Sequence, residues 1–219
     1  MNTNNTYYNQ NAQAFSESTF SVDMQPLYNE FLPLVPAGGY ILDAGCGSAR
    51  DAKVFKTQGF KVTAIDASEE LVKIATQYLG QPVELKTFQQ INDKNKFDGI
   101  WCCASLLHVP FNELDSVFTK LSNALKTNGV LYVSFKYGES AELKGKSQRE
   151  HNGRLFTDLN EQSLNNLLAN QKELKLNKTW ITGDRRAGRE GEQWLNAIII
   201  KSELKNTNPV GETSVLQGI

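Results

Sequence analysis

The stretch YILDAGCGSAR at residues 40–50 constrains the fold of this chain more than any other segment. It begins as a short apolar strand, turns at two glycines and continues into the start of a helix. Gly45 and Gly47 lack a Cβ atom, so the backbone can turn tightly there and approach a ligand closely. Ser48 is predicted to cap the helix that follows. The free N–H groups at such a helix start suit an anionic group such as a carboxylate.

Strand-like and helix-like patterns alternate through most of the chain, which predicts a doubly wound, parallel sheet. The last two strands are joined by a short charged turn, so we expect them to pair antiparallel. Residues 137–152 lack periodicity and are predicted to form a loop or an insertion near the site. The predicted strands are 40–43, 61–66, 83–87, 97–103, 129–136, 175–182 and 193–201, and the helices that follow or separate them are 48–58, 68–79, 112–126 and 159–170.

The two ends of the chain stand apart from this alternation. Residues 6–20 carry aromatic side chains among polar ones and predict an arm with a short helix, and residues 26–34 predict an amphipathic helix. Residues 205–219 are polar and irregular, so a disordered tail is expected there. The length suits one domain with a full core. We therefore expect a single domain over residues 1–204, with a helical arm at about residues 6–35.

Charge and cysteine content narrow the classes of partner. The net charge is −1 and the pI is about 6.2, so no bulk attraction to nucleic acid or to an anionic membrane is expected. No apolar run approaches the ~18 residues of a membrane span, and residues 1–5 lack the features of a secretion signal. The three cysteines, two of them adjacent, form neither a disulfide framework nor a spaced metal site. The expectation is a cytoplasmic protein without a metal site.

The glycine turn is a weak signal when taken alone, because it also opens dinucleotide sites with the pattern G-x-G-x-x-G/A. Here Arg50 stands at the third glycine position, and Asp43 precedes the turn, where an ammonium group would suit it better than a pyrophosphate. The segment ILDAGCGSARDA resembles the first motif of the class I S-adenosylmethionine (SAM)-dependent methyltransferases. The resemblance covers roughly residues 35–201 and is strongest to the tellurite-resistance-type, small-molecule branch.

This resemblance implies a Rossmann-like, three-layer α/β sandwich with a seven-stranded, mostly parallel sheet. The implied strand order is 3-2-1-4-5-7-6, with the last strand antiparallel. It also implies an enzyme that transfers a methyl group from SAM to a small-molecule acceptor by in-line displacement and releases S-adenosylhomocysteine. N-terminal arms in this family often fold over the cofactor, so residues 6–20 either do this or only cover the core.

Asp66 is the strongest cofactor-binding candidate after the glycine turn. It ends the second predicted strand, about 20 residues beyond the turn, where an acidic side chain can accept both ribose hydroxyls. Capping the next helix, before Ser68, is its alternative role. By resemblance, Asp43 orients the methionine end of the cofactor, and Phe88 and Gln89 contact the adenine or merely form a loop. The predicted cofactor-binding residues are Tyr8, Asp43, Gly45, Cys46, Gly47, Arg50, Asp66, Ala67, Phe88, Gln89, Cys103 and Ala104.

The segment after the fourth predicted strand, CCASLLH at residues 102–108, should line the seam between cofactor and acceptor, because ligands bind outside the carboxyl ends of the strands. The adjacent cysteines are interpreted as small core residues, with Cys103 or Ala104 near the cofactor. Neither motif typical of DNA methyltransferases, D/N-P-P-aromatic or Pro-Cys, occurs here. His108 could accept the proton of the attacking atom, since its ordinary pKa is near neutrality. A helix-start or wall role for His108 stays open.

The late arginines suggest how an acceptor is held. Arginine binds carboxylate or phosphate through a planar fork, so a rim of arginine and aromatic side chains suits a small anionic or planar acceptor. The alternative is a solvated turn in which Asp184 and Glu190 pair with the arginines. The predicted acceptor-binding residues are Tyr7, His108, Arg154, Phe156, Arg185, Arg186 and Trp194.

Two other functions remain open from the sequence. One is a methyltransferase that acts on RNA or protein, which the low pI and the absence of nucleic-acid motifs disfavour. The other is a SAM-binding regulator without catalysis, because the glycine turn and Asp66 bind a cofactor without specifying an acceptor. A monomer and a homodimer are equally compatible with the sequence.

Overall fold

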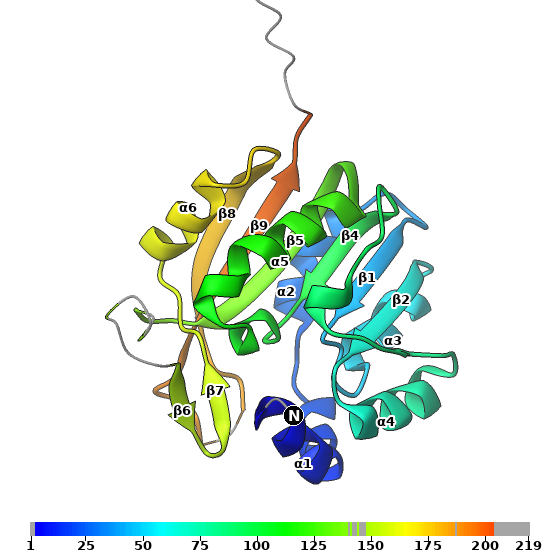
Figure 1. The fold of residues 1–219 in the computed structure, drawn as a ribbon. Helices are drawn as coiled ribbons and strands as arrows, with labels where there is room; N and C mark the ends of the chain where they lie inside the picture. The colour runs from blue at the N-terminus through cyan, green and yellow to red at the C-terminus, as the bar shows by residue number, and fades with distance from the viewer. Residues whose placement is uncertain (1–2, 140, 142–143, 145–147, 187, 204–219) are drawn as a thin grey trace, which may run out of the picture.

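A seven-stranded sheet forms the centre of the computed structural model, which describes residues 3–139, 141, 144, 148–186 and 188–203 (Figure 1). The strand order is β3-β2-β1-β4-β5-β9-β8. With the sheet strands numbered along the chain, this is the predicted order 3-2-1-4-5-7-6. The strands are β1 (Tyr40–Ala44), β2 (Lys61–Asp66), β3 (Glu84–Leu85), β4 (Phe97–Cys102), β5 (Leu125–Lys136), β8 (Leu174–Gly183) and β9 (Gln193–Lys201).

The direction of the strands follows from the length of their connections. The first five strands are joined by crossovers and pair in parallel, as in β1 with β2 and β4 with β5. The link from β8 to β9 spans only residues 184–192, which is too short for a crossover. Strand β9 therefore runs antiparallel to both β5 and β8. The predicted antiparallel last strand is confirmed.

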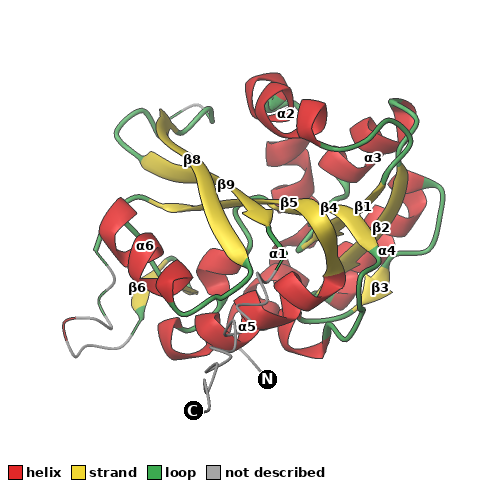
Figure 2. Cartoon of the chain, turned by 90° about the horizontal axis from the view of Figure 1, so that it is seen from above, coloured by secondary structure: helices red, strands yellow, loops and turns green. Residues whose placement is uncertain are grey.

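Helices cover both faces of the sheet and complete three layers (Figure 2). One face carries α2 (Gln25–Phe31), the short helix η1 (Leu32–Leu34) and α3 (Arg50–Thr57), and its core is built around Trp101, stacked on Tyr132 at 3.9 Å. The other face carries α5 (Phe111–Ala124) and α6 (Glu161–Ala169) over a separate core of aliphatic and phenylalanine side chains. Central parallel strands are apolar on both sides because both sides are buried.

Two segments that do not belong to the alternation of sheet strands and helices lie at the carboxyl ends of the parallel strands. Helix α1 (Thr3–Phe20) and the hairpin of β6 (Arg149–His151) and β7 (Arg154–Phe156) lie side by side below the sheet in Figure 1. The side chain of Asn4 joins them, because it accepts from the Leu155 N–H at 2.7 Å and donates to its carbonyl at 3.2 Å. The arm is thus more helical than predicted, and part of the expected loop is a hairpin. The predicted tail at 205–219 lies outside the described residues.

Helix starts show where the local prediction succeeds and fails. Ser68 caps α4 (Glu69–Leu79) by accepting from the Leu71 N–H at 3.2 Å, as expected. Ser48 does not cap α3, which begins at Arg50 after Ala49 in a left-handed conformation with φ of 62°. The turn continues two residues further than the sequence suggested, because left-handed residues recur through it. No helix within the described ranges is long and apolar enough to cross a membrane.

Candidate active site

Two adjoining cavities open at the carboxyl edge of the sheet, on either side of the glycine turn. The larger has a volume of about 530 Å³ and the smaller about 180 Å³. Their position agrees with the rule that ligands bind outside the carboxyl ends of parallel strands. Six residues line both cavities, namely Tyr8, Phe15, Gly45, Gly47, Ala104 and His108.

A side chain at Gly45 or at Gly47 would crowd a neighbouring residue, and that residue differs between the two positions. A Cβ atom at Gly45 would lie 2.4 Å from the Cβ of Ser105, whose hydroxyl donates to the Ala44 carbonyl at 2.8 Å. A Cβ atom at Gly47 would lie 3.1 Å from the ring of Phe15, which belongs to α1. Both glycines also have positive φ angles, which a side chain would strain. The turn is therefore a narrow strip of bare backbone between β4 and α1.

Asp66 lies at the end of β2 in the smaller cavity. Its carboxylate accepts from the Gly47 N–H and from the Ser68 N–H, both at 2.8 Å. Burial raises the pKa of Asp66 to about 6. Asp66 thus joins the glycine turn to the residue that caps the next helix, and its predicted role toward a ribose stays a prediction. Ala67, Phe88 and Gln89 line the same cavity, as expected of a nucleoside site.

Asp43 does not line either cavity. It is buried behind the turn, where its carboxylate accepts from the Ala52 N–H in the first part of α3 at 3.1 Å. Burial, together with the nearby Asp51 charge, raises the pKa of Asp43 well above its ordinary value. Any influence of Asp43 on a cofactor would therefore act through the position of the turn and of α3.

A buried network that the sequence did not predict surrounds Asp51, on the wall of the larger cavity. Arg50 pairs with Asp51 at 2.6 Å and donates to the Thr19 carbonyl at 3.0 Å. The Tyr28 hydroxyl and the Trp101 indole N–H also donate to Asp51, at 2.6 and 2.8 Å. An acidic residue in the first turn of a helix, next to an arginine, was the only sequence signal for this network.

His108 and Tyr8 form a hydrogen-bonded pair between the cavities. The Nδ1 atom of His108 lies 2.9 Å from the Leu155 carbonyl, which can only accept, so we assign the ring proton to Nδ1. Nε2 is then the acceptor for the Tyr8 hydroxyl at 2.8 Å. Burial lowers the pKa of His108 to about 4. The expectation of a near-neutral pKa was wrong, because the ring is removed from water and lacks a carboxylate partner in the described structure.

The adjacent cysteines differ in position. Cys102 is a core residue, whereas Cys103 lines the larger cavity beside the Ser134 hydroxyl. The Ala104 N–H donates to that same hydroxyl at 2.8 Å. Burial raises the pKa of Cys103 to about 12, so its thiol is not a ready nucleophile. Cys46 lines the larger cavity too, and burial raises its pKa well above the ordinary value.

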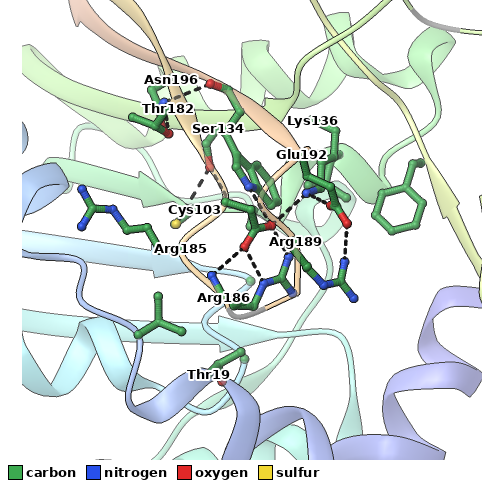
Figure 3. Close-up of a pocket in the computed structure, with 18 of the residues that line it drawn as sticks. Thr19, Cys103, Ser134, Lys136, Thr182, Arg185, Arg186, Arg189, Glu192 and Asn196 are labelled. Atoms are coloured by element: carbon green, nitrogen blue, oxygen red, sulfur yellow. Dashed lines mark hydrogen bonds and ion pairs between the residues drawn. The ribbon is translucent and has the colours of Figure 1, made fainter.

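Acidic partners already neutralise the cations around Asp184. Arg186 contacts Asp184 at 2.6 and 2.9 Å, and Lys136 contacts it at 3.0 Å. Figure 3 shows Arg186, Arg189, Lys136 and Glu192 of this group close together. Arg189 pairs with Glu192 at 3.0 Å, and Lys136 also bonds Glu192. Burial acts to raise the pKa of Asp184, but the hydrogen bonds from Arg186 and Lys136 hold it below its ordinary value. These side chains line the larger cavity as ion pairs.

Arg185 stands apart from this group in Figure 3 and lies 3.4 Å from Asp23. The arginines of this turn therefore form ion pairs, as in the alternative considered from the sequence. Among the described residues, Glu190 is not one of their partners. Glu190 instead accepts from the Gly188 N–H at 3.0 Å. Trp194 lines the larger cavity and donates its indole N–H to Asp184 at 3.0 Å.

Arg154 and Phe156 also line the larger cavity, on the β7 strand of the hairpin. Tyr7 does not line it, but its ring lies 4.8 Å from the Arg154 guanidinium. All the predicted acceptor-binding residues except Tyr7 thus line the larger cavity, His108 lines both cavities, and Tyr7 contacts Arg154. Within the described parts of the chain, no group of three histidine, cysteine, aspartate or glutamate residues could hold a metal ion.

Comparisons with known proteins find similarity to methyltransferases. Residues 42–133 match the family model described as "Methyltransferase domain". The ubiquinone biosynthesis O-methyltransferase of Xanthomonas axonopodis pv. citri is 33% identical over 111 residues, which cover 46% of this chain and 44% of that protein. The corresponding enzyme of Rickettsia typhi is 32% identical over 100 residues, which cover 43% and 39%. The match thus spans less than half the length of these curated relatives.

Solved structures show the same fold at low identity. The 1,6-didemethyltoxoflavin-N1-methyltransferase of Burkholderia thailandensis, with bound 1,6-didemethyltoxoflavin and S-adenosylhomocysteine, has a TM-score of 0.69 and 19% identity, over 90% of this chain and 85% of that one. Magnesium protoporphyrin IX methyltransferase of Synechocystis PCC 6803, with bound SAM, has a TM-score of 0.65 and 18% identity, over 90% and 95%. The [4+2]-cyclase SpnF also matches, with a TM-score of 0.64 and 19% identity, over 81% and 80%. This chain shares the fold of these three structures, and the cyclase illustrates that the fold alone does not define the reaction.

Proposed function

We propose that this protein is a SAM-dependent methyltransferase that acts on a small-molecule acceptor. The observation that carries the proposal is the position of Asp66, whose carboxylate faces a cavity of about 180 Å³ beside the bare backbone of Gly45 and Gly47. A carboxylate at this place fits a ribose, and the bare turn fits a close-lying chain of atoms. The match of residues 42–133 to a methyltransferase domain model supports the same conclusion.

The chain's own residues divide between the two ends of the cofactor. Asp66 would hold the ribose, and Ala67, Phe88 and Gln89 would surround the adenine. The backbone of the turn and the wall at Arg50 would accommodate the methionine end. When bound, SAM supplies an electrophilic sulfonium methyl group. The protein then has to position the acceptor in line, and good positioning is worth on the order of 7–11 kcal/mol.

The hydrogen-bonded pair of Tyr8 and His108 suggests where an acceptor proton goes. The Tyr8 hydroxyl occupies the Nε2 atom of His108, so His108 does not receive a proton directly from the acceptor. In the proposed step, the attacking atom gives its proton to the Tyr8 oxygen while Tyr8 passes its own proton to Nε2. An acceptor that attacks as an anion, such as a thiolate or a tellurium or selenium anion, needs no such step.

Three observations support a small acceptor over a polymer. The larger cavity is walled by α1 and by the β6–β7 hairpin, and the neighbour from B. thailandensis holds a small heterocycle. The curated relatives are named as O-methyltransferases of ubiquinone biosynthesis. Within this function, the tellurite-resistance-type branch rests on the sequence motif alone. We also propose that residues 1–204 form one domain.

The test starts with calorimetry of the purified protein and S-adenosylhomocysteine. We expect stoichiometric binding, whereas preferential binding of NAD would contradict the proposal. Labelled SAM is then incubated with the protein and with cell extract fractionated by size. Label in small molecules supports the proposal, and label in polymer supports an RNA or protein methyltransferase. Cofactor binding without any transfer of label supports a regulator.

A further inference from the structure

Arg154 is the most unusual cation in the larger cavity, because it is buried and has no acidic partner among the residues that the structure describes. Only 7% of the residue is exposed. The sequence contains six arginines, and the other five, Arg50, Arg149, Arg185, Arg186 and Arg189, each lie within 4.0 Å of a described carboxylate. Arg154 has no such neighbour among the described residues, and its buried Nε atom has no hydrogen-bond partner there.

A guanidinium keeps its positive charge inside a protein. A buried, unpaired charge is costly and is normally compensated by a counter-charge. The rings of Tyr7 and Phe156 lie 4.8 and 5.3 Å from the guanidinium carbon of Arg154. Such contacts attract the cation and hold its plane, but they do not use the N–H donors at its edge. Arg154 also hydrogen-bonds the Tyr8 side chain. Its Nε donor has no partner among the described residues, so the guanidinium is held in place with that donor unused.

An anion that entered the larger cavity would be attracted most strongly to Arg154, because the neighbouring cations already have carboxylate partners. Arg186 and Lys136 already contact Asp184, and Arg189 already contacts Glu192. Arg154 also lies beside the hydrogen-bonded pair at the seam. Burial raises the pKa of Tyr8 while the Arg154 charge opposes the increase, and burial lowers the pKa of His108 with the Arg154 charge adding to the decrease. A group bound at Arg154 would therefore lie next to the border between the two cavities.

We propose that Arg154 binds a carboxylate of the methyl acceptor, so that the acceptor is a small organic acid. The two oxygens of a carboxylate match the planar fork of a guanidinium. This inference rests on the proposed function, because it names the class of acceptor for that site. It also assigns anion binding to Arg154 instead of the arginine turn at 185–189, whose guanidinium groups have carboxylate neighbours.

The test uses benzoate and benzamide, which have nearly the same shape and differ in charge, together with acetate as a smaller acid. Binding is measured by calorimetry to the protein with and without S-adenosylhomocysteine. We expect benzoate to bind at least about tenfold more tightly than benzamide. Arg154→Gln should weaken benzoate by at least about tenfold, and Arg154→Lys should weaken it less, because lysine keeps the charge and loses the fork.

Arg185→Gln is the matched control, since Arg185 lines the same cavity and already lies near Asp23. It should leave benzoate affinity within about twofold of the wild type. Arg154→Met gives a second readout that does not depend on any ligand. If Arg154 exists to bind an anion, replacing its unpaired charge should leave the thermal midpoint of the unliganded protein unchanged or raise it. A clear decrease would indicate a structural arginine and contradict the proposal.

The outcomes separate this inference from the function on which it rests. Equal benzoate affinity in wild type and Arg154→Gln, with S-adenosylhomocysteine binding intact, overturns the Arg154 site only. Failure of acetate and benzoate to bind at millimolar concentrations overturns it as well. If benzoate binds through Arg154 but S-adenosylhomocysteine does not bind at all, the anion site stands and the methyltransferase function fails.

Discussion

At the scale of single residues, Asp66 shows most clearly how the cost of burying a carboxylate is offset by hydrogen bonds. Its carboxylate is 9% exposed, and burial acts against its charge. Two backbone N–H groups, from Gly47 and Ser68, partly compensate for that burial. Asp66 lines the smaller cavity, where the ribose hydroxyls of the proposed cofactor would also donate to its carboxylate.

Asp66→Ala should lower the affinity for S-adenosylhomocysteine roughly 10- to 150-fold. Hydrogen bonds to a charged group contribute about 1.5–3 kcal/mol, and 1.4 kcal/mol corresponds to a tenfold change. Calorimetry measures the effect. Glu69→Ala is the control, because Glu69 is exposed on the first turn of the following helix. Equal affinities of wild type and Asp66→Ala would remove Asp66 from the cofactor site.

The pKa of Asp66 also predicts how cofactor affinity depends on pH. In the proposed site the ionised carboxylate would accept from both ribose hydroxyls, and protonation would take away part of that capacity. Since the pKa is raised to about 6, affinity should be constant above about pH 6 and should decrease as pH falls below it. The limiting slope is about tenfold per pH unit. In Asp66→Asn the slope should vanish, and a slope that persists there would assign the titration to another group.

His108 predicts a pH profile for turnover that differs from that of an ordinary histidine. Its pKa is lowered to about 4, so the neutral, proton-accepting form prevails above that pH. Turnover should rise as pH increases through about 4 and stay level through neutrality. If the pair with Tyr8 transfers the proton, His108→Ala and Tyr8→Phe should each reduce turnover by about 10²–10⁴, and the double variant should be no slower.

His108→Ala should leave the affinity for S-adenosylhomocysteine nearly unchanged, which separates catalysis from cofactor binding. A histidine that only shapes the wall would give a smaller loss, mainly in the KM of the acceptor. A His108→Ala variant that keeps both the rising limb and wild-type turnover would exclude His108 from the reaction.

At the scale of elements, the network around Asp51 connects α2, α3 and β4 beneath the site. Tyr28 comes from α2, Arg50 and Asp51 from α3, and Trp101 from β4. A buried carboxylate is tolerated here because each neighbouring element supplies a donor. Arg50 is oriented by the same carboxylate, so the wall of the larger cavity depends on how these elements pack.

Tyr28→Phe should lower the free energy of unfolding by about 1.5–3 kcal/mol. The substitution removes one donor from a charged, buried acceptor and leaves the aromatic packing in place. Urea denaturation measures the change. Tyr78→Phe is the control, since Tyr78 is 41% exposed and should lose little. Similar losses in the two variants would mean that the Asp51 network does not stabilise the fold.

At the scale of the whole molecule, α1 closes the site by contacts with parts that are distant in sequence. Asn4 bonds β7, Tyr8 bonds His108, and Asn9 accepts from the Ser68 hydroxyl at 2.7 Å. The ring of Phe15 covers Gly47. A ligand in either cavity therefore lies against α1, and its binding should make the helix harder to open.

Hydrogen exchange with and without S-adenosylhomocysteine tests this arrangement. Amides of residues 3–20 and of the turn at 45–50 should exchange more slowly when the ligand is present. Amides of α6, which lines neither cavity, should change little and serve as the internal control. Protection of α6 to the same degree as α1, or no protection of α1, would contradict a direct role of the arm.

The sequence by itself determined the architecture, because the signals for it are local. Runs of apolar residues predicted the strands, and the short link before Gln193 predicted that the last pair is antiparallel. The position of Asp66 at the end of its strand indicated where the smaller cavity lies. The strand order followed from the family resemblance, and the structure agrees with it. Ser48 shows the limit of such rules, since the turn ran past it to Ala49 for reasons of backbone conformation.

Only the tertiary structure decided the charge states and partners within the site. Arg154 and Arg186 look equivalent in sequence, yet Arg154 is buried with no carboxylate neighbour in the described part of the chain, and Arg186 contacts Asp184. His108 has a lowered pKa because α1 and β7, from opposite parts of the chain, bury both of its nitrogens. Burial and ion pairing depend on distances between residues that are far apart along the chain, and a local pattern contains no record of those distances.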